Sequence, residues 1–410
     1  MQEEAKKYKQ IRKEHQPIAT FLAFALIPLS GFATDIYLPS LPNMAKNLHI
    51  SELQVQLTLS FFLISYGISQ LFIGSVLDSF GRFKIGFYAL LILAVSCIVI
   101  ANTHNIYLIY FMRVIHGLTV SAIVVAKRAY FVDLFTGEKL KHYLSLFTII
   151  WSTGPIVAPF VGGYLERSFG WESNFYFLAV FAIVFAVLEY IFSGETLKNF
   201  QEFTIKKIAL VYQEMLLTAS FTLGIVMLGL AYCMVMVFNM TGPFIIQHHL
   251  RLSVVYAGYS SLILGLAWML GGFIGKATIN KPFVKRLATN IAVQLAIVTA
   301  MIFSVSYLDN IYSLIGFAFF IHVAAGFTFN NYFTYCLARF PKNAGISGGL
   351  TGGLAYVLVS FLSYFIIEIF PAKDEQNLSY SYLTLISASL IVMWLIYIVA
   401  GKPKQDASLA

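Results

Sequence analysis

The feature that most limits the fold of this chain is a series of about twelve apolar runs. A helix that spans a bilayer needs about 20 consecutive apolar residues. Runs of that kind are predicted at 18–38, 53–77, 84–103, 106–126, 141–165, 173–193, 215–240, 254–275, 285–307, 311–335, 344–368 and 379–400. The most polar long interval in the interior is the linker at 194–214. The sequence therefore predicts an all-α membrane protein with two six-helix halves, 18–193 and 215–400, and polar tails at 1–17 and 401–410.

Composition supports a membrane protein over a soluble one. Only 11% of the residues are charged and 59% are hydrophobic, whereas soluble proteins carry about 25% charged residues. The net charge of +8 does not indicate a nucleic-acid partner, because the basic residues follow membrane sidedness rather than one patch. Cys97, Cys233 and Cys336 lie in apolar runs without metal-ligand spacing, so buried thiols are expected, with no metal and no cofactor.

The distribution of lysine and arginine predicts the orientation. With the N-terminal tail in the cytoplasm, about 22 of the 27 Lys and Arg residues fall on the cytoplasmic side, as the positive-inside rule requires. The outer side receives Lys46, Arg167, Arg251 and Lys373. Both tails and the linker at 194–214 are therefore expected in the cytoplasm. Two six-helix halves joined in this way are typical of transporters, which bind substrate between the halves.

The loop after the second span reads GSVLDSFGRFKIG, from Gly74 to Gly86. Glycines at 74 and 81 suit a tight turn and close backbone contacts. Asp78 can pair with Arg82, and Arg82 and Lys84 anchor the loop on the cytoplasmic side. This loop is the first candidate for a gating element.

Three ionisable residues fall in or beside apolar runs and are candidates for proton coupling. A charged group at the centre of a bilayer costs at least about 2.5–3.5 kcal/mol, so it is a functional candidate by default. Asp35 ends the first run, before Pro39 and Pro42, and can be either a solvated helix end or a shielded carboxylate that holds a proton. Arg113 cannot carry protons, but can tune a carboxylate or bind an anion, or simply snorkel. His116 lies on the same helical face and is either a packing residue or a second proton site.

Other polar and aromatic residues lie at the ends of spans or within them. Arg128 and Asp133 end the fourth span and act either as gate contacts or as anchors, and anchoring also suits Lys127. Glu189 is placed at a membrane interface, and His322 in helix packing. Aromatic walls suit flat or cationic compounds. Candidates for the wall of a substrate cavity, by helix position, are Tyr37, Phe61, Tyr66, Tyr232, Phe238 and Asn239.

Several of these stretches together resemble a known family. The loop at 74–86 resembles the pattern G-x-x-x-D-x-x-G-R-[RK]-x of the major facilitator superfamily, with Ser79 where many members carry arginine. RVIHGL, at 113–118, resembles its R-x-x-x-G motif, with His116 where glutamine is common. GPIVAPFVGG, at 154–163, resembles the antiporter motif G-P-x-x-G-G, with extra spacing. Small residues there allow close helix packing, and prolines bend the segment. The motif residues are Gly154, Pro155, Pro159, Gly162 and Gly163.

With TDIYLPSLP, VQLTLSFF, AKRAYFVDLF and GPFIIQHHLRLSVVYAGYS, the chain resembles the Bcr/CflA branch of the drug:proton antiporter 1 group. The resemblance covers nearly the whole chain and is strongest in the first half. It implies twelve helices and export of small organic molecules in exchange for protons across a bacterial inner membrane. It does not identify the substrate, and members of this branch include antibiotic-resistance transporters.

Three functions follow from these observations. The leading prediction is a proton-coupled exporter of drug-like compounds or metabolites, which works as a monomer in the lipid bilayer. The first alternative is a dedicated transporter of one metabolite, such as a siderophore. The second is a membrane sensor or scaffold without transport, but such a protein has no need of Asp35 and Arg113 at their insertion cost. An enzyme is not expected, since the sequence has no phosphate-binding loop, nucleophile elbow or zinc motif.

Overall fold

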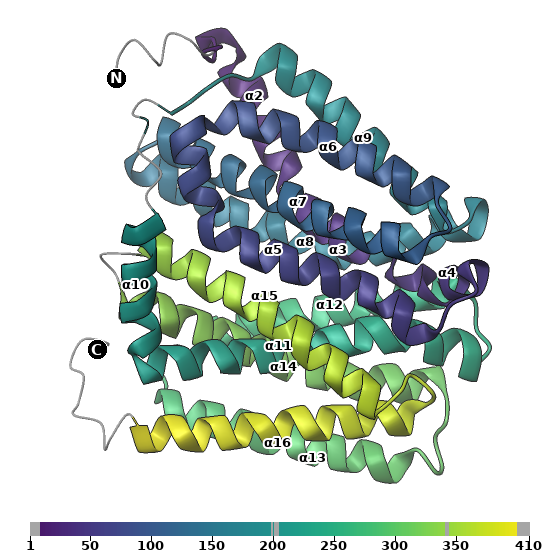
Figure 1. The fold of residues 1–410 in the computed structure, drawn as a ribbon. Helices are drawn as coiled ribbons and strands as arrows, with labels where there is room; N and C mark the ends of the chain where they lie inside the picture. The colour runs from purple at the N-terminus through teal and green to yellow at the C-terminus, as the bar shows by residue number, and fades with distance from the viewer. Residues whose placement is uncertain (1–8, 198–199, 201–204, 341–343, 400–410) are drawn as a thin grey trace. The chain divides into compact units, whose positions relative to one another are not determined.

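The computed structural model describes residues 9–197, 200, 205–340 and 344–399 (Figure 1). The predicted tail at 401–410, and parts of the tail at 1–17 and of the linker at 194–214, lie outside the described residues. Within the described part the chain is helical, with an isolated β-bridge between Gln10 and Glu195. The helices of the first half are η1 (Lys13–His15), α2 (Gln16–Leu26), α3 (Leu29–Asp35), η2 (Leu38–Ser40), α4 (Leu41–Leu48), α5 (Glu52–Phe80), α6 (Arg82–Asn102), α7 (Ile106–Leu134), α8 (Gly137–Phe169) and α9 (Glu172–Phe192).

The remaining helices are α10 (Ile205–Leu217), α11 (Ala219–Phe244), the π-helix η3 (Ile245–His249), α12 (Val254–Ala277), α13 (Phe283–Ser304), α14 (Ile311–Arg339), α15 (Ala344–Ile369) and α16 (Glu375–Val399). Eleven helical segments of the described chain are long and apolar enough to cross a membrane. The 33-residue helix α8 is not among these eleven, but it is long enough to be the twelfth span. The prediction of an all-α, twelve-span membrane protein is confirmed.

The first span is longer than the sequence predicted. It was expected at 18–38, but the helical path runs from Lys13 to Leu48 through α2, α3, η2 and α4. Pro39 and Pro42 occupy the second positions of η2 and α4, within the first turn, where a missing N–H costs no helical hydrogen bond. These prolines therefore restart the helix instead of ending it. Asp35 consequently lies within the path of the first span and not at its exit.

Polar side chains define where several helices begin. Ser51 and Gln54 form a reciprocal capping box at the start of α5. Asn105 accepts hydrogen bonds from the first free N–H groups of α7, and Asn310 does the same for α14. These caps explain why the observed helices start close to the predicted positions in both halves.

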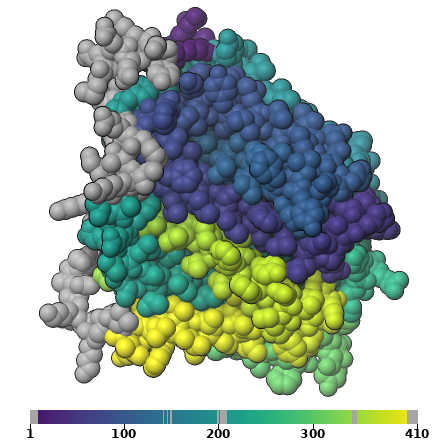
Figure 2. Space-filling view, in the orientation of Figure 1, coloured from purple at the N-terminus to yellow at the C-terminus, as the bar shows by residue number. Residues whose placement is uncertain are grey.

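The contacts divide the chain into two compact units, which are described separately. The first unit contains residues 1–204 and 242–263. In it α7 packs on α5 and α6, α6 packs on α9, and α3 packs on α8. In the space-filling view, the purple and blue helices of this unit pack side chain to side chain (Figure 2). The second unit contains residues 205–241 and 264–410, and in it α13 packs on α14 and α16.

Candidate functional site

Three buried ionisable residues meet in the first unit. Asp35 is the last residue of α3, and Arg113 and His116 lie on one face of α7, which packs against α3. Their exposed fractions are 1% for Asp35 and 0% for both Arg113 and His116. The structure thus brings together the residues that the sequence singled out for proton coupling.

Carbonyl oxygens, a hydroxyl group and aromatic rings hold the guanidinium group of Arg113, which forms no ion pair with a carboxylate in the described part of the chain. Its Nε donates to the carbonyl oxygen of Thr58 at 3.3 Å, and Nη1 donates to that of Ala33 at 2.9 Å. Nη2 donates to the hydroxyl of Tyr37 at 3.4 Å. The guanidinium carbon also lies 4.6 Å from the ring centroids of both Tyr37 and Phe62. We call these two rings the aromatic clamp, since each contributes a cation–π contact to the same buried cation.

The hydroxyl of Tyr37 has a defined direction of donation. It lies 3.0 Å from Oγ1 of Thr58, which itself donates to the carbonyl oxygen of Val55 at 2.6 Å. Tyr37 therefore donates to Thr58 and accepts from Arg113, because arginine can only donate. Sequence reasoning missed Thr58 and Phe62, although both lie on one face of the helix within the quoted stretch VQLTLSFF.

The hydrogen bonds of His116 are those of a neutral imidazole ring. Nδ1 lies 3.2 Å from Nη1 of Arg113, so this nitrogen must be the acceptor. Nε2 lies 3.4 Å from Sγ of Cys97 and carries the ring proton. A second proton would place two N–H donors against each other at Nδ1. His116 can therefore become charged only if its contact with Arg113 breaks.

Asp35, unlike Arg113 and His116, is buried without hydrogen bonds from its side chain in the described structure. Neither carboxyl oxygen has a hydrogen-bond partner in the described structure, although the residue is almost fully buried. An ionised carboxylate in such surroundings is strongly unfavourable, since nothing replaces its hydration. A protonated, neutral carboxyl group carries a much smaller penalty. The surroundings of Asp35 in this conformation therefore fit a carboxyl group that holds a proton.

A second cluster surrounds the loop between α5 and α6. Arg82 binds Asp78 at 2.8 Å and also forms an ion pair with Asp133 near the end of α7. Its Nη1 donates to the carbonyl oxygen of Ala129 at 3.0 Å. The structure thus adds Asp133, which the sequence had placed at the end of a different span, to the predicted pair of Asp78 and Arg82. Lys84 and Arg128 are exposed at the same end of these helices.

Glu195 completes this second cluster and was missed by sequence reasoning. Its Oε2 accepts a hydrogen bond from the backbone N–H of Phe83 in the first turn of α6, at 3.1 Å. Its Oε1 accepts from the N–H groups of Thr196 and Leu197, both at 3.0 Å. Gly81 has φ of 94°, and a Cβ atom there would lie 2.7 Å from Oε2 of Glu195. Glycine is therefore required at 81, whereas a Cβ at Gly74 would meet nothing within 4 Å.

Lys127 and Glu189 form a buried ion pair between α7 and α9. Nζ of Lys127 lies 2.5 Å from Oε2 of Glu189, and both residues are buried. From the sequence, Lys127 was predicted to anchor its helix end and Glu189 to lie at a membrane interface. Nothing in the sequence pairs two residues that are 62 positions apart, so only the packing of α7 and α9 reveals the contact.

The motif in α8 produces a close crossing with α3. A Cβ at Gly162 would lie 1.6 Å from the carbonyl oxygen of Ile36, and one at Gly154 would lie 2.5 Å from that of Pro28. Pro155 fills the space beside Gly31 of α3. Further along, Pro159 and Gly163 face the start of α12, near Gly258 and Val254. The small residues of this motif therefore allow backbone contact, as the sequence suggested.

The aromatic candidates for a substrate cavity are spread over both units. In the first unit Tyr37 is fully buried, Tyr66 stacks on Phe62, and Phe61 packs on Tyr110.

In the second unit Tyr232 lies among Trp268, Phe329 and Tyr356, and Phe238 packs against His322. Asn239 is buried in α11. In the described part of the chain no three His, Cys, Asp or Glu side chains are grouped to hold a metal ion.

Comparison with known proteins finds one superfamily model and several transporters that are similar to this chain. A family model described as Major Facilitator Superfamily matches residues 23–364. A 171-residue segment is 33% identical to the bicyclomycin resistance protein homolog of Haemophilus influenzae, covering 42% of this chain and 43% of that protein. The multidrug resistance protein MdtL of Shewanella oneidensis is 24% identical over 352 residues, or 85% of this chain and 87% of that protein. The solved structure of a bacterial homologue of the human lysosomal transporter Spinster aligns with a TM-score of 0.73 at 13% identity, over 95% of this chain and 96% of that one.

Proposed function

Since this chain belongs to the Major Facilitator Superfamily, we propose that it exports small organic molecules across a bacterial inner membrane in exchange for protons. The observation that carries the proposal is Asp35, a buried carboxyl group without a hydrogen-bond partner, located beside the Arg113 network. Family membership makes the protein a multi-pass membrane transporter and not an enzyme. Beyond family membership, we propose that transport is coupled to protons and that it runs outward.

Asp35 is the proposed proton carrier. When the substrate site faces the acidic exterior, Asp35 takes up a proton and substrate leaves. When the site faces the cytoplasm, substrate binding favours loss of that proton, so proton and substrate compete through two conformations. Arg113 supplies a permanent positive charge that lowers the cost of the ionised carboxylate. The clamp and the backbone acceptors of Arg113 keep that charge in place in this conformation.

His116 has a supporting role in this mechanism. Its neutral ring accepts a hydrogen bond from Arg113, which favours Asp35 over His116 as the proton carrier. Asp78, Arg82 and Asp133 are the proposed gate contacts, because they tie the ends of α5, α6 and α7 together. This gate is proposed to lie in the cytoplasm, together with both chain ends and the linker.

The substrate class is proposed from the relatives. Proteins named for bicyclomycin resistance and for multidrug resistance match this chain, the latter over most of its length. Drug-like compounds are therefore the first substrates to test. One transporter molecule is proposed to be the working unit.

The test is transport by purified protein in liposomes under an imposed pH gradient. A panel of drug-like compounds, with bicyclomycin included, should contain at least one that moves against its gradient when protons flow the other way. Collapse of the gradient with an ionophore should stop that movement. Transport of a compound at the same rate with and without a pH gradient would refute proton coupling while leaving transport itself intact.

A further inference from the structure

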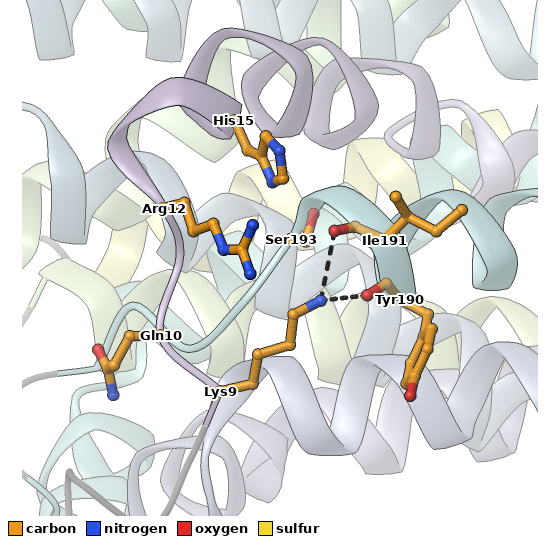
Figure 3. Close-up of a pocket in the computed structure, with 7 residues that line it drawn as sticks. All are labelled: Lys9, Gln10, Arg12, His15, Tyr190, Ile191 and Ser193. Atoms are coloured by element: carbon orange, nitrogen blue, oxygen red, sulfur yellow. Dashed lines mark hydrogen bonds between the residues drawn. The ribbon is translucent and has the colours of Figure 1, made fainter.

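A cavity of about 350 Å³ lies where the N-terminal segment crosses the end of α9 (Figure 3). It is separate from the Asp35 and Arg113 site, since none of its lining residues belongs to that network. The lining residues are Lys9, Gln10, Arg12, His15, Tyr190, Ile191 and Ser193. Figure 3 shows the side chains of Lys9, Arg12 and His15 directed toward the same space.

Among the described residues that line the cavity, Lys9, Arg12 and His15 are basic and none is a carboxylate. Glu14 lies outside the lining but within ion-pair distance of both groups, at 3.7 Å from Arg12 and 3.8 Å from His15. The side chains of Arg12 and Glu14 are exposed to nearly the same extent, 72% and 70%, so water screens their attraction and a second anion can still bind Arg12. The pKa of Lys9 is lowered by its partial burial and by the neighbouring charge of Arg12, against an opposing effect of Glu189. The charges of Lys9 and Arg12 therefore repel each other, and an anion in the cavity would relieve that repulsion.

Lys9 donates hydrogen bonds to the end of α9, so Arg12 and His15 are the side chains that can bind a ligand. Its Nζ donates to the carbonyl oxygens of Tyr190 and Ile191 at the end of α9 (Figure 3). The C-terminal end of a helix carries partial negative charge, which would otherwise disfavour an anion. Because Lys9 neutralises that end, Arg12 and His15 can donate to a ligand.

An apolar stripe leads along α9 to this cavity. Large side chains that recur every three or four positions are exposed on one face of the helix, and these are Val180, Ile183, Val184, Val187 and Ile191. In a membrane-spanning helix such a face contacts acyl chains. Ile191 belongs to both the stripe and the cavity. The ligand that matches both features has an anionic phosphate attached to a hydrocarbon chain.

We infer that this cavity binds the phosphate group of an anionic phospholipid, whose acyl chain lies along the exposed face of α9. Arg12 and His15 contact the phosphate oxygens, and Lys9 fixes the wall between them and the helix end. Basic groups beside the ends of spanning helices are a known way in which proteins recognise anionic lipids. The site is independent of the transported substrate.

The experiment measures the melting temperature of the full chain in a neutral detergent. Phosphatidylglycerol should raise the melting temperature, whereas phosphatidylcholine and inorganic phosphate at equal phosphate concentration should not. Equal effects of phosphatidylcholine would show that charge is not recognised. Equal effects of inorganic phosphate would show a site for a soluble anion. Either result overturns the inference, and both are read on the unmodified protein without any transport assay.

A matched pair of variants locates the site. Arg12→Gln and Lys13→Gln each remove one positive charge from adjacent exposed positions, but only Arg12 lines the cavity. We expect Arg12→Gln to lose at least half of the shift caused by phosphatidylglycerol, and Lys13→Gln to retain it. Equal losses in the two variants would mean that the lipid responds to general surface charge, and this would overturn the assignment to the cavity.

Discussion

At the scale of single residues, the neighbouring ionisable side chains of Arg113 and Asp35 have opposite surroundings. Arg113 donates hydrogen bonds to two carbonyl oxygens and a tyrosine hydroxyl, and it lies between two aromatic rings. Asp35 has no hydrogen-bond partner for either carboxyl oxygen in the described structure. Arg113, whose three guanidinium nitrogens all donate hydrogen bonds, is suited to remain fixed. A residue without such bonds is suited to change its protonation state.

The aromatic clamp gives the first prediction. Phe62→Leu removes one ring from Arg113, and a desolvated cation–π contact is worth about 2 kcal/mol. We expect the pH profile of substrate-induced proton release to shift measurably, because the position of the Arg113 charge relative to Asp35 is less well held. Phe62→Tyr keeps the ring and is the matched control. A pH profile in Phe62→Leu identical to that of Phe62→Tyr would show that the clamp does not position Arg113.

His116 gives a second prediction at this scale. Asparagine can present an acceptor oxygen to Arg113 but cannot bind a proton near neutral pH. We therefore expect His116→Asn to release as many protons per bound substrate as the unmodified protein. The measurement is proton release with a pH-sensitive dye, normalised to bound substrate. Loss of one released proton in this variant would identify His116 as a second carrier.

At the scale of helices, most span positions could be predicted and several contacts could not. Long apolar runs and the caps at Ser51, Asn105 and Asn310 define the helix positions locally. The pair Lys127–Glu189 and the contact of Glu195 with the start of α6 join residues 62 and 112 positions apart. Such contacts depend on how helices pack, which hydrophobic periodicity does not specify. The first span was predicted to end at 38, just before Pro39, but the helical path continues through Pro39 and Pro42 to Leu48.

The crossing of α3 and α8 provides the prediction for this scale. Gly162→Ala would place a methyl group 1.6 Å from the carbonyl oxygen of Ile36, so the helices must separate. Overpacking of this kind costs at least about 1–3 kcal/mol. Gly74→Ala is the matched control, since its methyl group meets nothing within 4 Å and alanine favours the helix by about 0.5–1 kcal/mol. Melting temperatures in detergent should fall for Gly162→Ala and hold or rise for Gly74→Ala, and equal values would contradict the crossing.

At the scale of the whole molecule, the distribution of charge predicts the orientation in the membrane. The sequence carries 27 Lys and Arg residues, and the predicted topology puts most of them on one side. We expect a fluorescent protein fused after Ala410, and another inserted in the linker at 194–214, to report the cytoplasm. A phosphatase fusion at the same positions should be inactive. An active phosphatase at either position would contradict the proposed orientation.

The central claim is that Asp35 carries the proton that is exchanged for substrate. The most direct measurement is substrate-induced proton release by purified protein in detergent, followed with a pH dye, for the unmodified chain and for Asp35→Asn. The amide keeps the shape of the side chain and cannot titrate. We predict proton release from the unmodified protein and none from Asp35→Asn, which still binds substrate. Proton release from Asp35→Asn with the amplitude of the unmodified protein would contradict the claim.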